Sequence, residues 1–490
     1  MTGEAELRVS GRFWFADNPD LIVPGTLDLT GRRPRVELLG ALSAFVQEVP
    51  SSAPGTRTYE PADPSAPRTI QGALMGSKTV VTLCNAYQVK HTVKGFTLSF
   101  DEPNSGLQQE VIEGAYAVVG AHIEGLETQF QQIRFRIAGQ DAWCHHVGLS
   151  MEHDAEGIRI NYAEPDTLSA ALTDTSGVLS LDASATFCFP RIAGSFIETK
   201  TWLRVSIDAG ISIREAWRRY VLGSSVLLTL LNDRDCPPVA FQVKSPEDGL
   251  WCDVVVPGLK DDPLDLRSAK IDDPSLISRQ QLGLGRLARW FELIEALRPL
   301  PHLAAGTIEH GGRTVQNQLL ELATAAEGLH RRLYPDERQL TPVETGQAIE
   351  AVTDSPINEE AKRLILGALR IYLSEPSFPK RLQRLAEDVS LVAPGITGRT
   401  NRWYRAISDA RNGFAHSLRG EESDDTLFSH LTLTKSIRWL ITARLLMELD
   451  VPIEILKLAF ERFERYQQFL RNAKRDCPRV YAAVDQKAGA

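Results

Sequence analysis

Arg411 and His416 are the pair of residues whose types and spacing best suit chemistry at a phosphodiester. A histidine titrates near neutral pH, so it can take a proton from a ribose 2′-hydroxyl or give one to the leaving 5′-oxygen. An arginine keeps its charge and offers a planar fork that can hold a phosphate as charge grows on it. The 2′-hydroxyl would be the internal nucleophile, so the chemistry open to this pair is cleavage of RNA without a metal ion.

The segment that carries this pair is expected to be a basic helix end. Residues Asn401–Ala410 have a helical pattern, and Asn412-Gly413 is typical of a C-terminal stop, so the pair would lie where the chain turns. The alternative is a solvated helix with a capping arginine and a surface histidine. The spacing i, i+3, i+6 aligns three further arginines on one helix face as a predicted RNA-binding strip: Arg399, Arg402 and Arg405.

A near match to a phosphate-binding loop runs from Gly72 to Thr79. The loop needs glycine where Ser77 stands, and it must lead into a helix. The residues that follow, Val80–Leu83, are strand-like instead. A β-hairpin is therefore the favoured interpretation.

A metal site could be imagined around Cys144, His145, His146 and His153. Adjacent residues of a strand point to opposite faces, and no second cysteine or histidine pair completes a tetrahedron. A serine-hydrolase elbow, Gly-x-Ser-x-Gly, is also lacking. The sequence therefore predicts neither a metal nor another cofactor.

The 490-residue chain is acidic overall, with 63 Asp and Glu residues against 54 Lys and Arg, and a formal net charge of −9. This balance excludes a nonspecific coat for nucleic acid or anionic membranes, but not a local basic site. The six cysteines form no CxxC, and the N-terminus lacks the pattern of a signal peptide. The most apolar runs, Tyr220–Leu231 and Ile437–Leu449, are too short to span a membrane or carry arginines. We therefore expect a soluble, cytoplasmic protein.

The pattern of the chain changes near residue 260, which predicts two regions of different class. Residues 1–256 contain short runs rich in β-branched and aromatic residues, such as Phe96–Phe100, and turn residues separate these runs. This pattern is typical of an antiparallel β-rich region, either sandwich-like or a barrel. One inserted helix is expected after Ser212, which forms a capping box with Glu215. The sequence predicts a linker at residues 257–276, an all-α bundle at residues 277–480 and a frayed tail at residues 481–490. The expected helices are Leu282–Leu297, Val315–Leu333, Glu359–Leu373, Phe378–Leu391, Asn401–Ala410, Leu427–Leu449 and Ile453–Phe469.

The helical region resembles the HEPN superfamily, whose signature is Arg-x(4–6)-His with a polar residue after the arginine. Arg411, Asn412 and His416 match it, and the helix around Glu327 resembles the one that carries an acidic residue in that family. The β-rich region resembles the ApeA N-terminal domain. Its matching positions are Gly11-Arg12-Phe13-Trp14-Phe15, Val23-Pro24-Gly25, Val36 to Gly40, Gly72, Thr82-Leu83-Cys84, Val119-Gly120, Phe130 and Trp143.

The resemblance implies a metal-independent endoribonuclease of ApeA type, acting as a toxin in abortive-infection anti-phage defence. Arg411 would stabilise the phosphate, and His416 would be the general acid or base. Asn412 would orient the phosphate or the histidine of the partner subunit, and Glu327 would fix Arg411. The implied site is a composite of both subunits of a homodimer, cleaving cellular RNA with tRNA as the favoured substrate. From the order of the two regions alone, we expect the β-rich region to sense a phage-derived trigger or to restrain the nuclease.

An alternative from a different class is a noncatalytic RNA-binding or ligand-sensing scaffold with a helical dimerisation domain. Degenerate members of the superfamily motivate it, and intact Arg411 and His416 argue against it.

Overall fold

The computed structural model describes most of the chain: residues 8–44, 46–49, 58–61, 66–75, 80–94, 107–146, 148–154, 157–188, 196–260, 275–309, 313–370, 375–416 and 424–482. It divides into two compact units. The β unit comprises Met1–Ser225 and Pro237–Lys270, and the helical unit comprises Val226–Cys236 and Ile271–Ala490. The expected strand Phe96–Phe100 and most of the expected linker lie outside the described residues, and the boundaries expected at 256 and 277 stay predictions.

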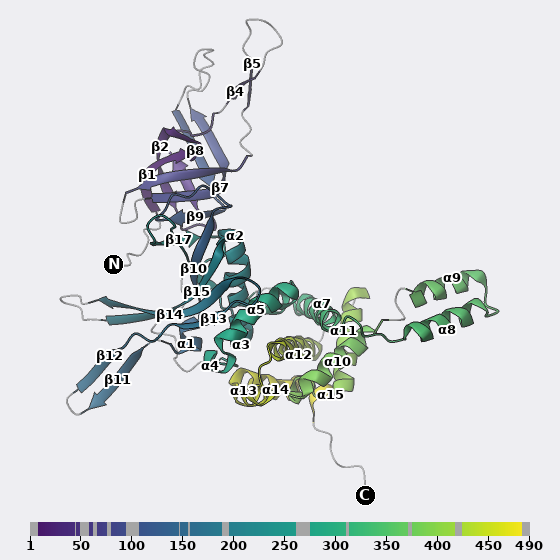
Figure 1. Ribbon diagram of the computed structural model, residues 1–490. Coiled ribbons are helices and arrows are strands. Elements are labelled where there is room, and N and C mark those ends of the chain that lie inside the picture. Colours follow the sequence, from purple (N-terminus) through teal and green to yellow (C-terminus); the bar gives the residue numbers. More distant parts are fainter. Residues whose placement is uncertain are drawn as a thin grey trace. The chain divides into compact units, whose positions relative to one another are not determined.

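The first part of the β unit is a closed antiparallel barrel (Figure 1). Its strands pair in the order β7-β6-β1-β2-β3-β8, and β8 also pairs with β7, which completes the ring. Their bounds are β1 (Arg8–Phe15), β2 (Asn18–Asp28), β3 (Arg35–Leu38), β6 (Arg68–Leu74), β7 (Val80–Lys94) and β8 (Leu107–Glu113).

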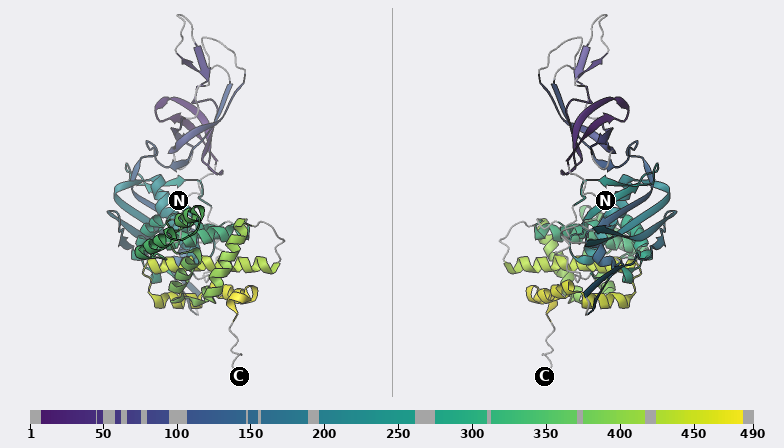
Figure 2. Two further views of the ribbon diagram at one scale, coloured as in Figure 1. Left: turned by 90° about the vertical axis from the view of Figure 1, so that its right-hand side faces the viewer. Right: turned by 90° about the vertical axis from the view of Figure 1, so that its left-hand side faces the viewer.

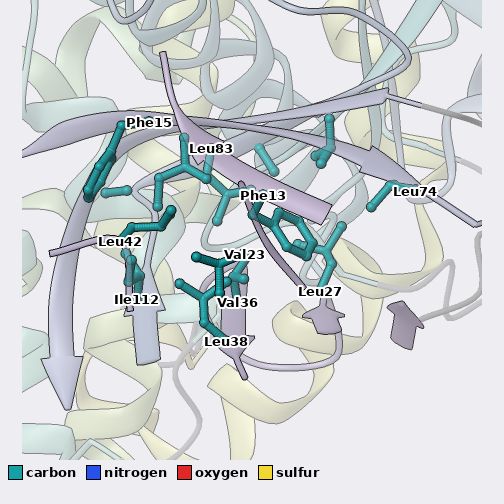
Figure 3. Close-up of a cluster of buried hydrophobic side chains, with 14 of the residues drawn as sticks. Phe13, Phe15, Val23, Leu27, Val36, Leu38, Leu42, Leu74, Leu83 and Ile112 are labelled. Atoms are coloured by element: carbon teal, nitrogen blue, oxygen red, sulfur yellow. The ribbon is translucent and has the colours of Figure 1, made fainter. Parts of the chain in front are cut away.

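Alternating residues of these strands fill the barrel with apolar side chains (Figure 3). Phe13, Leu27 and Val36 are fully buried there. A Cβ on Gly72 would lie 2.6 Å from Cδ1 of Phe13, so the ring occupies the space that a side chain at position 72 would need. Gly72 also pairs with Val81 of β7, so the described residues on both sides of 76–79 are paired strands, and no helix follows as a phosphate-binding loop requires; residues 76–79 themselves lie outside the described part of the chain.

The remaining strands continue from the barrel as an open antiparallel sheet. They are β9 (Tyr116–Val119), β17 (Trp251–Val255), β16 (Pro238–Lys244), β10 (Gln129–Ile137), β15 (Phe196–Ser212), β14 (Gly177–Cys188) and β13 (Leu168–Ala171). Two separate ribbons pair β4 (Val46–Val49) with β5 (Thr58–Pro61), and β11 (Leu149–Asp154) with β12 (Gly157–Tyr162).

The inserted helix follows Ser212, whose hydroxyl accepts the backbone N–H of Glu215 at 3.3 Å. It runs through α2 (Ile213–Ala216), a π-helical turn (Trp217–Val221) and α3 (Leu222–Asn232). A short helix not expected from the sequence, α1 (Gln140–Cys144), carries the candidate metal ligand Cys144, and His145 follows it with a φ of 46°. Cys144 and His145 are therefore not on a strand, contrary to the expectation from the sequence, whereas His153 lies on β11. Within the described residues, no group of three or more His, Cys, Asp and Glu could hold a metal ion.

The helical unit is built around α12 (Asp424–Glu448), which is buried from Thr432 to Leu446 and contacts α6, α7, α10, α11 and α14 (Figure 1). In the views of Figure 2, the β unit consists mostly of strands and the helical unit almost wholly of helices. The other helices are α4 (Arg279–Leu282), α5 (Leu284–Ala296), α6 (Leu300–Glu309), α7 (Val315–Leu333), α8 (Pro342–Thr353), α9 (Glu359–Ala368), α10 (Phe378–Ser390), α11 (Thr400–His416), α13 (Ile453–Arg462), α14 (Glu464–Asp476) and α15 (Pro478–Tyr481).

The predicted fold class, an antiparallel β-rich region followed by a helical bundle, is confirmed. The helix predicted at Val315–Leu333 has the observed bounds, but the single helix predicted at Ile453–Phe469 is two helices, because Phe463 is extended. Helices α6 and α8 were missed since each has a proline in its first turn, where proline is tolerated. None of the helices described is both long and apolar enough to cross a membrane.

His302 on α6 predicts a pH-dependent stability. Burial and the neighbouring Arg298 lower the pKa of His302 to about 4, and its buried ring nitrogens have no hydrogen-bond partner within the described residues. The unfolded chain binds this proton near pH 6.5, so stability is complete above that pH and decreases as the pH falls towards 4. We expect His302→Gln to flatten the dependence of Tm on pH between 6.5 and 4. An unchanged slope in the variant would assign the effect to other groups.

Candidate active site

The Arg411–His416 motif lies on the last turns of α11. Asn412-Gly413 was predicted to stop this helix, and that prediction is wrong, since the helix continues to His416. Glycine in a helix costs only about 1 kcal/mol relative to alanine, which one position can tolerate. Positions 411 and 416 are therefore about 140° apart around a continuous helix, whereas positions 412 and 416 share a face. The side chain of His416 lies outside the described part of the chain.

Arg411 is held by two groups from other helices. Its Nη2 donates to Oε2 of Glu327 on α7 at 3.2 Å, and its guanidinium lies 4.3 Å from the ring centre of Phe378 on α10. The structure thus brings together Arg411 and the glutamate that the sequence associated with it. About a third of the Arg411 side chain stays exposed, so the fixed guanidinium can still meet an external anion.

An ion-pair chain continues from Glu327 along α7 and α10. The second oxygen of Glu327, Oε1, accepts from Nη2 of Arg331 at 3.4 Å. Arg331 also lies 2.8 Å from Oε2 of Glu375, and the same oxygen accepts from Nη2 of Arg381 at 2.8 Å. Three guanidinium groups thus share two carboxylates.

The buried end of the chain is formed by Arg381 and His330. Arg381 is almost fully buried, and its Nη1 lies 3.3 Å from Nδ1 of His330, which is completely buried. Burial lowers the pKa of His330, and this outweighs the opposing effect of Glu337, whose Oε2 lies 2.9 Å from Nε2. His330 is therefore neutral at pH 7, and a neutral Nδ1 can accept from Arg381. Burial also lowers the pKa of Arg381, and Arg331 adds to the effect.

A second polar cluster fixes α7 to α10 and α12. The hydroxyl of Tyr334 bonds to Asp388, and Nη2 of Arg444 donates to that hydroxyl at 3.3 Å. Burial and the bond to Asp388 raise the pKa of Tyr334, so the phenol stays protonated. These contacts hold the end of α7 that follows Glu327 and Arg331.

The predicted RNA-binding strip does not lie beside Arg411. Arg399 precedes α11, where its N–H donates to the carbonyl of Val480, and Nη1 of Arg402 donates to the carbonyl of Arg479 at 3.1 Å. Arg405 is exposed one turn further along. Position 402 is about 180° around the helix from position 411, but positions 405 and 416 are only about 20° apart, so the strip lies on the side of His416 and not on that of Arg411. Its role in RNA binding stays a prediction.

Several residues of the site were not singled out from the sequence, among them Arg331, Phe378 and His430. Arg331 follows Glu327 by four positions, the spacing of a helical ion pair, and this signal could have identified it. His430 of α12 packs its ring 4.8 Å from that of Phe414, edge to face, which places a titratable group beside the end of α11. No local pattern marks Phe378 or His430, because their contacts join distant segments.

The arrangement is suited to binding and charge stabilisation at a phosphate. A preorganised guanidinium stabilises developing negative charge without further reorganisation, which is the largest single contribution in many enzymes. Proton transfer would fall to the histidine of the motif.

Two family models match the chain. The ApeA N-terminal domain 1 matches residues 8–283, more than half of the chain, and Apea-like HEPN matches residues 320–454. The second range includes Glu327, Arg411, Asn412 and His416. No curated protein and no solved structure matches the chain.

Proposed function

Since the chain belongs to the ApeA family and carries a HEPN domain, the domain of a class of nucleases found in anti-phage defence, we propose that it is a metal-independent endoribonuclease. The observation that carries the proposal is Arg411, which Glu327 and Phe378 hold in place with part of its guanidinium exposed. Arg411 binds the scissile phosphate and stabilises the charge that develops on it. His416 transfers the proton, and Asn412 orients the phosphate.

The helix geometry favours a site shared by two copies of the chain. Positions 411 and 416 are about 140° apart on α11, so the two residues leave the helix on different sides. A two-fold axis beside α11 brings the arginine of one copy near the histidine of the other and supplies two histidines, one as base and one as acid.

The biological role proposed is abortive infection, in which the active toxin cleaves cellular RNA, with tRNA as the favoured substrate. The β unit senses the phage-derived trigger. This role rests on the order of the units, in which the β unit matched by ApeA N-terminal domain 1 precedes the HEPN domain.

Removal of metal ions tests the chemistry directly. We expect the purified protein to cleave RNA equally well in EDTA, because arginine and histidine supply charge and proton transfer without a metal. The products carry a 2′,3′-cyclic phosphate and a 5′-hydroxyl, and an oligonucleotide with a single 2′-deoxy substitution at the cleavage site stays intact. Cleavage that requires Mg²⁺, or that proceeds across the 2′-deoxy position, would overturn the mechanism. Salt-dependent binding without cleavage would favour the RNA-binding scaffold.

A further inference from the structure

Glu327 holds two arginines, one on each oxygen of its carboxylate. Arg411 bonds to Oε2 at 3.2 Å and Arg331 to Oε1 at 3.4 Å. Because both guanidinium groups bind the same carboxylate, they lie side by side, although they come from helices α11 and α7. The site therefore presents a pair of guanidinium groups, where the sequence motif contains only one.

Arg331 is the more accessible of the two. Half of its side chain is exposed, against a third for Arg411. It is also anchored, since Nη1 lies 2.8 Å from Glu375, and Glu375 is in turn held by the buried Arg381. A cation fixed by two carboxylates loses little freedom when it binds an anion, and it can contact a phosphate with the edges that the carboxylates leave open.

We propose that Arg331 is a second phosphate-binding residue of the RNA site, which contacts a phosphate next to the one held by Arg411. The inference rests on the proposed ribonuclease function and deepens it. The surface that contacts RNA then extends from Arg411 on α11 to Arg331 on α7, beside Glu327.

The neighbouring residue supplies a matched control. Arg332 is also an exposed arginine on α7, but its guanidinium donates to the carbonyls of Ala296 and Arg298 and has no contact with Glu327. Arg331→Ala and Arg332→Ala each remove one charge from adjacent positions of one helix. A general effect of net charge would appear in both variants, and an effect of the site only in the first.

The test measures binding of a fluorescent single-stranded oligoribonucleotide of mixed sequence to the full chain over a range of salt concentrations. All variants carry His416→Ala so that the probe is not cleaved. A residue that contacts a phosphate contributes about 0.7 to the slope of log K against log salt for single-stranded nucleic acid. We expect Arg331→Ala to reduce the slope by about this amount and to raise Kd about five- to tenfold at low salt. Arg332→Ala should change neither.

The possible failures are distinguishable. An unchanged salt slope in Arg331→Ala, with tight binding by the parent, would overturn the role of Arg331 and leave the ribonuclease proposal intact. Equal changes in both variants would also overturn it. If the parent does not bind the oligoribonucleotide and the wild-type chain does not cleave RNA, the proposed function itself fails.

Discussion

Arg411→Ala is expected to lower kcat/KM for RNA cleavage about 10²- to 10³-fold, as removal of one preorganised charge donor does in other enzymes. The guanidinium lies 3.2 Å from Glu327 and 4.3 Å from the ring of Phe378, so it is held in position before the substrate binds. Initial rates on a labelled oligoribonucleotide, with circular dichroism to confirm the fold, measure the effect.

Two further variants are expected to lower the cleavage rate less than Arg411→Ala does. Arg411→Lys keeps the charge but loses the planar fork, so we expect an intermediate rate. Glu327→Gln keeps the shape of the carboxylate but not its charge, and the arginine is then held less firmly, so a loss of about tenfold is expected. Arg471→Ala, which removes an exposed arginine of α14 paired with Glu464, is the control for net charge and should retain full activity. Wild-type rates in a folded Arg411→Ala would refute the assignment.

Asp233→Ala is expected to reduce the free energy of unfolding by about 3 kcal/mol, as the loss of one partner from a buried ion pair does. Asp233 accepts a hydrogen bond from Nη2 of Arg438 at 2.6 Å, and the Arg438 side chain is only 9% exposed. The backbone carbonyl of Asp233 also accepts from Arg465 at 3.2 Å. Without the carboxylate, Arg438 would be buried without its partner in the middle of α12.

Asp450→Ala is the matched control for this stability prediction. Both aspartates have a positive φ, 47° at Asp233 and 55° at Asp450, so alanine introduces similar backbone strain at each position. Asp450, however, pairs with the exposed Arg289, and an exposed pair contributes little. Chemical denaturation of the full chain compares the two. Equal losses would show that the effect comes from backbone strain and not from the buried ion pair.

The helices that could be predicted from sequence are those whose signals are local. The apolar period of Val315–Leu333 is preceded by Thr314, whose hydroxyl accepts the N–H of Asn317, and the observed helix has the predicted bounds. The end of α11 was misplaced because Gly413 resembles a stop in sequence, while the helix continues to His416. Val226–Cys236 packs with the helical unit, although it lies within the β-rich region of the sequence. Its apolar pattern is that of any buried helix, so the sequence does not show which unit it packs against.

Contacts between distant segments account for what the sequence could not show. Closure of the barrel depends on the pairing of β7 with β8, and a pattern of alternating residues does not specify which strands meet. The motif and Glu327 could be named from a family resemblance, but Glu375, Arg381 and Phe378 reach the site from outside the motif helix. Arg331 was also missed, although its i, i+4 spacing from Glu327 could have identified it in the sequence.

The most direct test of the ribonuclease function compares the wild-type chain with His416→Ala on purified RNA in EDTA. We expect the wild type to produce fragments that end in a 2′,3′-cyclic phosphate, and His416→Ala to produce them at least about 100-fold more slowly, the usual effect of losing a general acid or base. Cleavage at the wild-type rate by folded His416→Ala, or no cleavage by a wild-type chain that has met its trigger, would contradict the assignment of Arg411 and His416 as the active site of an RNA-cleaving enzyme.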